Sequence, residues 1–187
     1  MSSIHFIKTE LAAALARGVR QCVLVGSRPL FQEALKSPPD QNFHVFTVDE
    51  EHSSVSPGTF VPTQLASEAL ATALERSDFD KRKASLFIWL GGPGYRTVDA
   101  VIAGLAFIAS LPGGTGVVFD YAAERTSLRT VAHTALDALA SRICLAGTLK
   151  YLIQPQAVAE MLRGLGFRQI VDLAQSVSGG HLVSAVV

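Results

Sequence analysis

The 187-residue sequence has little charge and no surplus of either sign. Lys and Arg together number 16, as do Asp and Glu, so the formal net charge at pH 7 is zero, and charged residues are 17% of the chain. This balance excludes the basic surface that a nucleic-acid-binding protein needs, and we expect no nucleic-acid partner. The low charged fraction predicts that some apolar surface is covered by a second copy, most simply in a homodimer.

Cysteine is scarce, and histidine is scattered. Cys22 and Cys144 lie in apolar segments without CxxC spacing. They are typical of buried thiols in a reducing compartment rather than of a disulfide framework. The five histidines form no HxH or HxxxH pair, so we expect no metal site.

The sequence also lacks a clear targeting or membrane segment. Residues 1–10 have no apolar core behind a basic flank, as a signal peptide would. The uncharged run 100–119 is interrupted by Pro112, Gly113, Gly114 and Gly116, which favours helix, turn and strand over a membrane span. We therefore expect a cytoplasmic protein without a membrane partner.

Hydrophobic residues, by contrast, make up 49% of the chain, enough for the core of a single domain over residues 1–187. Short apolar runs alternate with segments of helical periodicity, which is typical of a doubly wound α/β sheet. A Gly-Gly turn between the last two runs predicts a hairpin, with the closing strand at 183–187 antiparallel to the others. The expected strands span 21–26, 43–49, 59–62, 84–90, 115–120, 167–174 and 181–187; the expected helices span 10–17, 30–36, 65–76 and 124–146, with others opening at 97 and 155.

Ligands of such sheets bind beyond the carboxyl ends of the parallel strands, where the strand order reverses. Asp49 closes the second expected strand and follows Gly26 by 23 residues. This spacing suits a carboxylate that accepts both ribose hydroxyls of an adenosine cofactor. The alternative is a solvated acid at a strand end.

The turn after the first expected strand contains Gly26, Ser27 and Arg28. Gly26 allows close approach of a ligand to the backbone, but no second glycine follows, so GxGxxG is absent. Arg28 either binds a carboxylate or phosphate or is an exposed loop arginine.

Two later loops open at the same expected edge. Residues Gly91 to Tyr95 contain three glycines and either wrap a ligand or form a tight connection. Asp120 and Tyr121 end the fifth expected strand and either face a substrate or lie at the surface. No GxSxG elbow supports Ser/His/Asp catalysis.

The chain resembles the leucine carboxyl methyltransferase family, and more closely its bacterial branch of S-adenosylmethionine-dependent proteins. The resemblance covers almost the whole chain. The similar segments are GVRQCVLVG at 18–26, FTVD at 46–49, LFIW at 86–89 with Gly91 and Tyr95, FIASLPGG at 107–114, VFDY at 118–121, and the closing helix and strand within 155–173.

This resemblance implies a class I methyltransferase-like Rossmann fold, with a seven-stranded doubly wound sheet and an antiparallel last strand. It also implies S-adenosylmethionine as cofactor, and it identifies no catalytic residue. The positions that it places against the cofactor are Gly26, Ser27, Arg28, Asp49, Gln64, Leu90, Gly91 and Tyr95.

The sequence departs from the family pattern around the cofactor. Arg28 replaces the second glycine of the first turn, and Leu30 replaces the acid of that turn. Gln64 and Leu90 stand where the family has acids. Of these cofactor-facing acids only Asp49 remains, so we expect weak or lost binding of S-adenosylmethionine. The family's helical segment ahead of the first strand is also nearly absent.

The resemblance implies methyl transfer to an oxygen, on a carboxylate or hydroxyl of a small-molecule or peptide acceptor. A carboxylate is already nucleophilic, whereas a hydroxyl needs a general base, for which the sequence offers no compelling candidate. Two alternatives stay open. One is a non-catalytic homologue that uses the fold for binding or interaction. The other is a nicotinamide-dependent oxidoreductase, which the missing GxGxxG and the closing hairpin disfavour.

Overall fold

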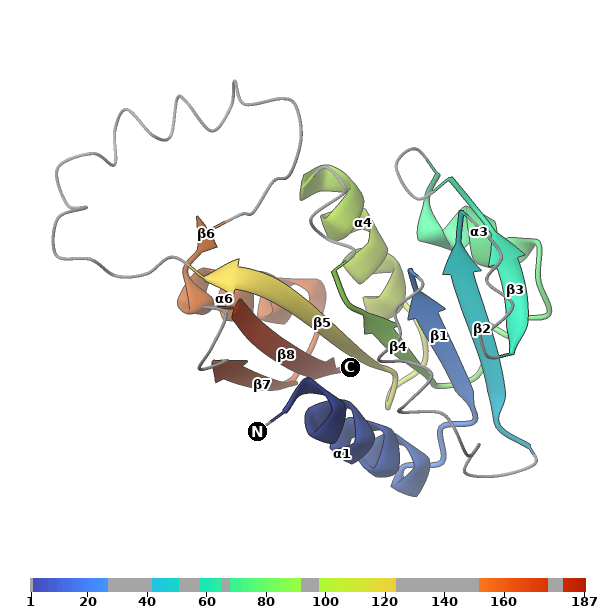
Figure 1. Ribbon diagram of the computed structural model, residues 1–187, viewed down its shortest axis with the longest axis horizontal. Coiled ribbons are helices and arrows are strands. Elements are labelled where there is room, and N and C mark those ends of the chain that lie inside the picture. Colours follow the sequence, from blue (N-terminus) through green and yellow to red (C-terminus); the bar gives the residue numbers. More distant parts are fainter. Residues whose placement is uncertain are drawn as a thin grey trace, which may run out of the picture.

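A mixed β-sheet with helices on both faces forms the centre of the protein (Figure 1). The computed structural model describes residues 2–26, 42–50, 58–64, 68–91, 98–123, 152–174 and 180–187. The strands are β1 (Gln21–Val25), β2 (His44–Asp49), β3 (Thr59–Pro62), β4 (Ser85–Trp89), β5 (Gly116–Ala123), β6 (Leu152–Ile153), β7 (Gln169–Ala174) and β8 (Gly180–Val186). The helices are α1 (Ser3–Ala16), α3 (Leu70–Glu75), α4 (Val98–Ala109) and α6 (Pro155–Leu165).

The strand order confirms the predicted doubly wound sheet. Along the sheet the strands follow β3-β2-β1-β4-β5-β8-β7, and the two-residue β6 pairs with β5 off this path. β1 to β5 run parallel, whereas β8 is antiparallel to both β5 and β7. The sequence predicted the antiparallel closing strand but not β6.

Alternating side chains along the strands divide the core into two layers. Val23 and Val25 of β1 belong to the layer covered by α3, α4 and α6, whereas Cys22 and Leu24 belong to the layer covered by α1. Every residue of β1 and β4 is buried, as expected for parallel strands covered on both faces.

The structure confirms Cys22 as a buried thiol, and burial raises its pKa to about 12. The thiol is therefore un-ionised at neutral pH and packs as a small apolar group. Cys144, the other predicted buried thiol, lies outside the described residues.

Helix ends follow local capping signals. The N–H of His5 donates to the Ser2 hydroxyl at 3.3 Å, and this cap starts α1 well before the predicted position 10. Pro155 begins α6, and Gly166 ends it with φ +109°. Of the predicted helix 65–76 the structure shows Leu70–Glu75; the predicted helices 30–36 and 124–146 lie outside the described residues.

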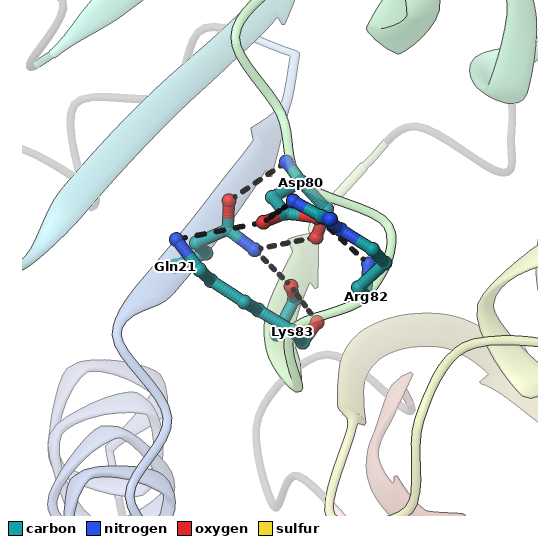
Figure 2. A network of polar contacts seen from close by, with 5 residues as sticks. Gln21, Asp80, Arg82 and Lys83 are labelled. Carbon is teal, nitrogen blue, oxygen red and sulfur yellow. Dashed lines mark hydrogen bonds and ion pairs between the residues drawn. The ribbon is translucent and has the colours of Figure 1, made fainter.

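A polar network ties the amino end of β1 to the loop before β4 (Figure 2). The Gln21 amide, 4% exposed, donates to the Asp80 carbonyl at 3.0 Å and to the Ser85 hydroxyl at 3.1 Å. Its oxygen accepts the N–H of Asp80 at 3.0 Å. The network holds the amino edge of the sheet, opposite the edge where the parallel strands end.

Candidate functional site

The strand order reverses between β1 and β4, and the site is expected at their carboxyl ends. Gly26 follows β1 with φ +84°, and Gly91 lies just beyond β4 with φ +62°, conformations that favour glycine. A Cβ built on Gly26 would meet no atom within 4 Å, so its glycine is required by backbone conformation and not by crowding. The chain therefore turns sharply on both sides of the reversal.

Asp49 ends β2, one strand away from β1, and is half-buried. Its Oδ1 accepts the N–H of Glu50 at 2.7 Å, and its carbonyl accepts the N–H of Thr63 at 3.0 Å. Within the described part of the chain, no hydrogen bond engages Asp49 Oδ2. One carboxylate oxygen is thus fixed by the main chain, and the other is available to a ligand hydroxyl.

Gln64 follows β3 on the far side of β2 and is exposed. Its carbonyl accepts the N–H of Glu68 at 2.8 Å. The side chain of Glu68 accepts the Thr63 hydroxyl at 2.7 Å and also binds Arg76. Hydrogen bonds from Arg76 and then from Thr63 lower the pKa of Glu68 to about 2. These contacts fix the segment that carries Gln64.

Leu90 and Gly91 behave differently at the end of β4. Leu90 is 4% exposed and packs in the α1-side core, so its side chain belongs to the hydrophobic layer. The N–H of Gly91 donates to the carboxylate of Asp120, which lies on the neighbouring strand β5. An acid therefore does stand at this edge, next to Leu90, but on β5 rather than β4.

The structure brings some of the sequence-predicted site residues to one edge and leaves others undescribed. Gly26, Asp49 and Gly91 follow or end adjacent strands at the carboxyl edge. Ser27, Arg28 and Tyr95 lie outside the described residues. That these residues hold a cofactor stays a prediction.

A second polar group lies further along the same edge; the sequence pointed to its Tyr121 but not to Asp172 or His181. Tyr121 of β5 donates its hydroxyl to Asp172 Oδ2 at 2.5 Å. His181 of β8 places Nδ1 2.6 Å from Asp172 Oδ1. Burial, and then the hydrogen bond to Asp172, raises the pKa of Tyr121 above its ordinary value. The hairpin pairing of β7 with β8 was the one available signal, because it places 172 and 181 on diagonal positions.

The described parts of the chain hold neither a metal-binding cluster nor a helix of membrane-spanning length and hydropathy. No three His, Cys, Asp or Glu side chains gather there as a metal would require. None of the helices described is both long and apolar enough to cross a bilayer.

Solved structures of methyltransferases share this fold at low sequence identity. An S-adenosylmethionine-dependent methyltransferase from Archaeoglobus fulgidus gives a TM-score of 0.58 at 14% identity, covering 100% of this chain and 95% of that chain. Human N-acetylserotonin methyltransferase, in complex with S-adenosylmethionine, gives 0.61 at 14% identity, covering 98% and 51%. An O-methyltransferase family protein from Burkholderia thailandensis gives 0.60 at 12% identity, covering 98% and 54%.

These similarities establish the fold as that of class I methyltransferases, as the sequence predicted. The chain spans about half the length of the last two proteins. No protein-family model and no curated protein matches the sequence.

Proposed function

We propose that the chain binds S-adenosylmethionine at the carboxyl edge of the sheet and transfers its methyl group to an oxygen acceptor. Asp49 carries this proposal. It ends the strand next to β1, its orientation is fixed by Glu50, and its Oδ2, which bonds to none of the described residues, is placed to bind a ribose hydroxyl. The positive-φ turn at Gly26 lets a ligand approach the end of β1 closely.

For the methyl transfer itself, the protein must position the cofactor and the acceptor and exclude water. The acceptor oxygen attacks the methyl carbon in line with the departing sulfur, so holding both partners supplies most of the rate enhancement. The acceptor is a small molecule or a peptide. Membership of the leucine carboxyl methyltransferase family, a homodimer and a cytoplasmic location are parts of the same proposal.

The affinity is expected to be low, because uncharged residues stand at two positions where the family resemblance implies acids. Gln64 is exposed after β3, and Leu90 belongs to the hydrophobic layer. Each charged hydrogen bond lost is worth roughly 1.5–3 kcal/mol. Two such losses weaken binding by about two to four powers of ten if they add.

Calorimetry with S-adenosylhomocysteine tests the proposal. We expect weak binding by the natural chain, loss of binding in Asp49→Asn, and no change in Asp78→Asn, an exposed acid near the amino edge. Gln64→Asp should tighten binding by about 10- to 100-fold, since one charged hydrogen bond is worth roughly 1.5–3 kcal/mol. Absence of binding at millimolar ligand contradicts cofactor binding, and a low-micromolar dissociation constant contradicts the weakening.

The second candidate function is a non-catalytic homologue that uses the fold to bind a partner. The replacement of the cofactor-facing acids by Gln64 and Leu90 supports it. It predicts that calorimetry detects no binding heat with S-adenosylhomocysteine, although cooperative unfolding shows that the chain is folded. It also predicts no recovery of binding in Gln64→Asp.

A further inference from the structure

Three polar side chains from three neighbouring strands meet where β5 ends. Asp172 of β7 lies between the two others, with Oδ2 accepting from Tyr121 and Oδ1 contacting Nδ1 of His181. The rings of Tyr121 and His181 lie 5.1 Å apart between centroids. The side chains of His181 and Asp172 are 18% and 22% exposed, so most of each side chain is buried and the remainder is in contact with solvent.

The contacts orient the imidazole of His181. A carboxylate only accepts hydrogen bonds, so Nδ1 carries the proton that points to Asp172, and the lone pair of the neutral ring is on Nε2. The neighbouring Tyr121 ring, tilted 35° to the imidazole, limits rotation of His181 out of this orientation. The arrangement leaves Nε2 as a proton acceptor.

Tyr121 itself is unsuited to accept a proton. Burial and the contact with Asp172 raise its pKa, so its hydroxyl stays protonated at neutral pH and serves as a donor. Its donation to Oδ2 occupies the second oxygen of Asp172. Asp172 is thereby fixed from both sides, which makes it a positioning residue for His181.

The cluster and the proposed cofactor site share one edge of the sheet. β8 runs antiparallel, so His181, its second residue, lies at the level where the parallel strands end. Pairing places Tyr121 opposite His181, two residues beyond the row formed by Trp89, Phe119 and Val183. β8 is two strands from β4, which is about 10 Å at the usual strand spacing. An acceptor bound beyond β5 can therefore lie between the cofactor and His181.

We infer that His181 is the general base of this protein and that its acceptor is an alcohol or a phenol. The inference rests on the proposed function and specifies its substrate class, because a carboxylate acceptor needs no base. The acceptor oxygen forms a bond to the methyl carbon as the carbon–sulfur bond breaks, and the electron pair of that bond stays on sulfur as a thioether. The hydroxyl proton passes to Nε2 of His181 and then to solvent.

Methyl transfer from methyl-labelled S-adenosylmethionine to paired probes tests the inference. The probes are phenols and benzyl alcohols, each beside the matching benzoate. We expect labelled ethers and no labelled esters. His181→Gln should lower kcat about 10²- to 10⁴-fold, the usual contribution of a general base, without changing the dissociation constant of S-adenosylhomocysteine. His44→Gln, at an exposed histidine on the opposite edge, should change neither.

Two further variants separate chemistry from structure. Asp172→Asn should lower kcat with little change in the KM for S-adenosylmethionine, and Asp172→Glu should recover part of the loss. His181→Gly should regain activity when imidazole is added, which a structural role would not produce.

Each contrary result has a distinct meaning. Three results overturn the inference and leave cofactor binding intact. They are formation of esters alone, an unchanged kcat in His181→Gln, and no product from any hydroxyl probe although the chain binds S-adenosylhomocysteine. No binding of S-adenosylhomocysteine overturns the proposed function, and the inference falls with it.

Discussion

Gly104 of α4 lies tightly against Trp89 of the sheet. A Cβ at Gly104 would lie 2.9 Å from Cζ3 and 3.0 Å from Cη2 of Trp89, a fully buried ring. Because a buried indole has little room to move, we expect Gly104→Ala to lower the free energy of unfolding by about 1–3 kcal/mol. Urea denaturation measures this.

The matched control is Gly164→Ala in α6, where an added Cβ meets no atom within 4 Å. There, alanine should raise the free energy of unfolding by up to about 1 kcal/mol through helix propensity. Equal stabilisation by both substitutions would show that Trp89 does move aside.

Glu68 makes stability depend on acid pH. Its pKa lies at about 2 in the folded chain, against an ordinary 4.5, chiefly because Arg76 donates to it. Between these values the unfolded chain binds more protons, so stability rises with pH from about 2 to 4.5 and is lost on acidification. Glu68→Gln should flatten this slope in thermal unfolding between pH 2 and 6. Glu75→Gln, whose ion pair with Lys81 is exposed, should keep it.

Some positions in the site could be predicted from local sequence, whereas others depend on contacts between distant segments. The strand-end position of Asp49 followed from an apolar run and a spacing, both local features, and the structure places it there. The contact between Asp172 and His181 depends on the register in which β7 pairs with β8. The amino-acid composition of the segment that joins the two strands does not determine this register. The burial of Leu90 depends on α1, which is distant in the chain.

Among elements, those with strong local signals were predicted best. β3 has the predicted bounds, because a polar stretch of sequence precedes it and Pro62 is its last residue. α1 begins seven residues before the predicted start, since its first turn depends on the Ser2 cap and on burial of Phe6 and Ile7. β6 consists of two residues paired with β5, and no periodicity can indicate so short a strand.

The join between β1 and the loop before β4 depends on Gln21. Gln21→Leu preserves side-chain size but removes the partners of the Asp80 main chain and one partner of the Ser85 hydroxyl. Leaving such groups unsatisfied should lower the free energy of unfolding by about 1–3 kcal/mol, measured in urea. Gln169→Leu, at an exposed position of β7, should change it by less than about 0.5 kcal/mol. A similar small effect at both positions would mean that water replaces the amide of Gln21.

At the scale of the whole molecule, zero net charge at pH 7 predicts a solubility minimum near neutral pH. β7 lies at one end of the sheet and carries Val171, which is 53% exposed. A lysine at an edge strand adds charge and opposes edge-to-edge association. Val171→Lys should therefore raise solubility at pH 7 in polyethylene glycol precipitation, with the melting temperature unchanged. Unchanged precipitation would locate the association surface elsewhere.

The place of β8 in the sheet also sets the order in which the domain can be completed during synthesis. β8 lies between β5 and β7 and hydrogen-bonds to both, although it follows them in the chain. While the ribosome extends the polypeptide, the edges of β5 and β7 that pair with β8 stay without this partner until residues 180–186 have been made. Open strand edges are the surfaces through which nascent chains misassociate. The seven residues of β8, made after the other strands, thus complete the hydrogen bonding of both β5 and β7.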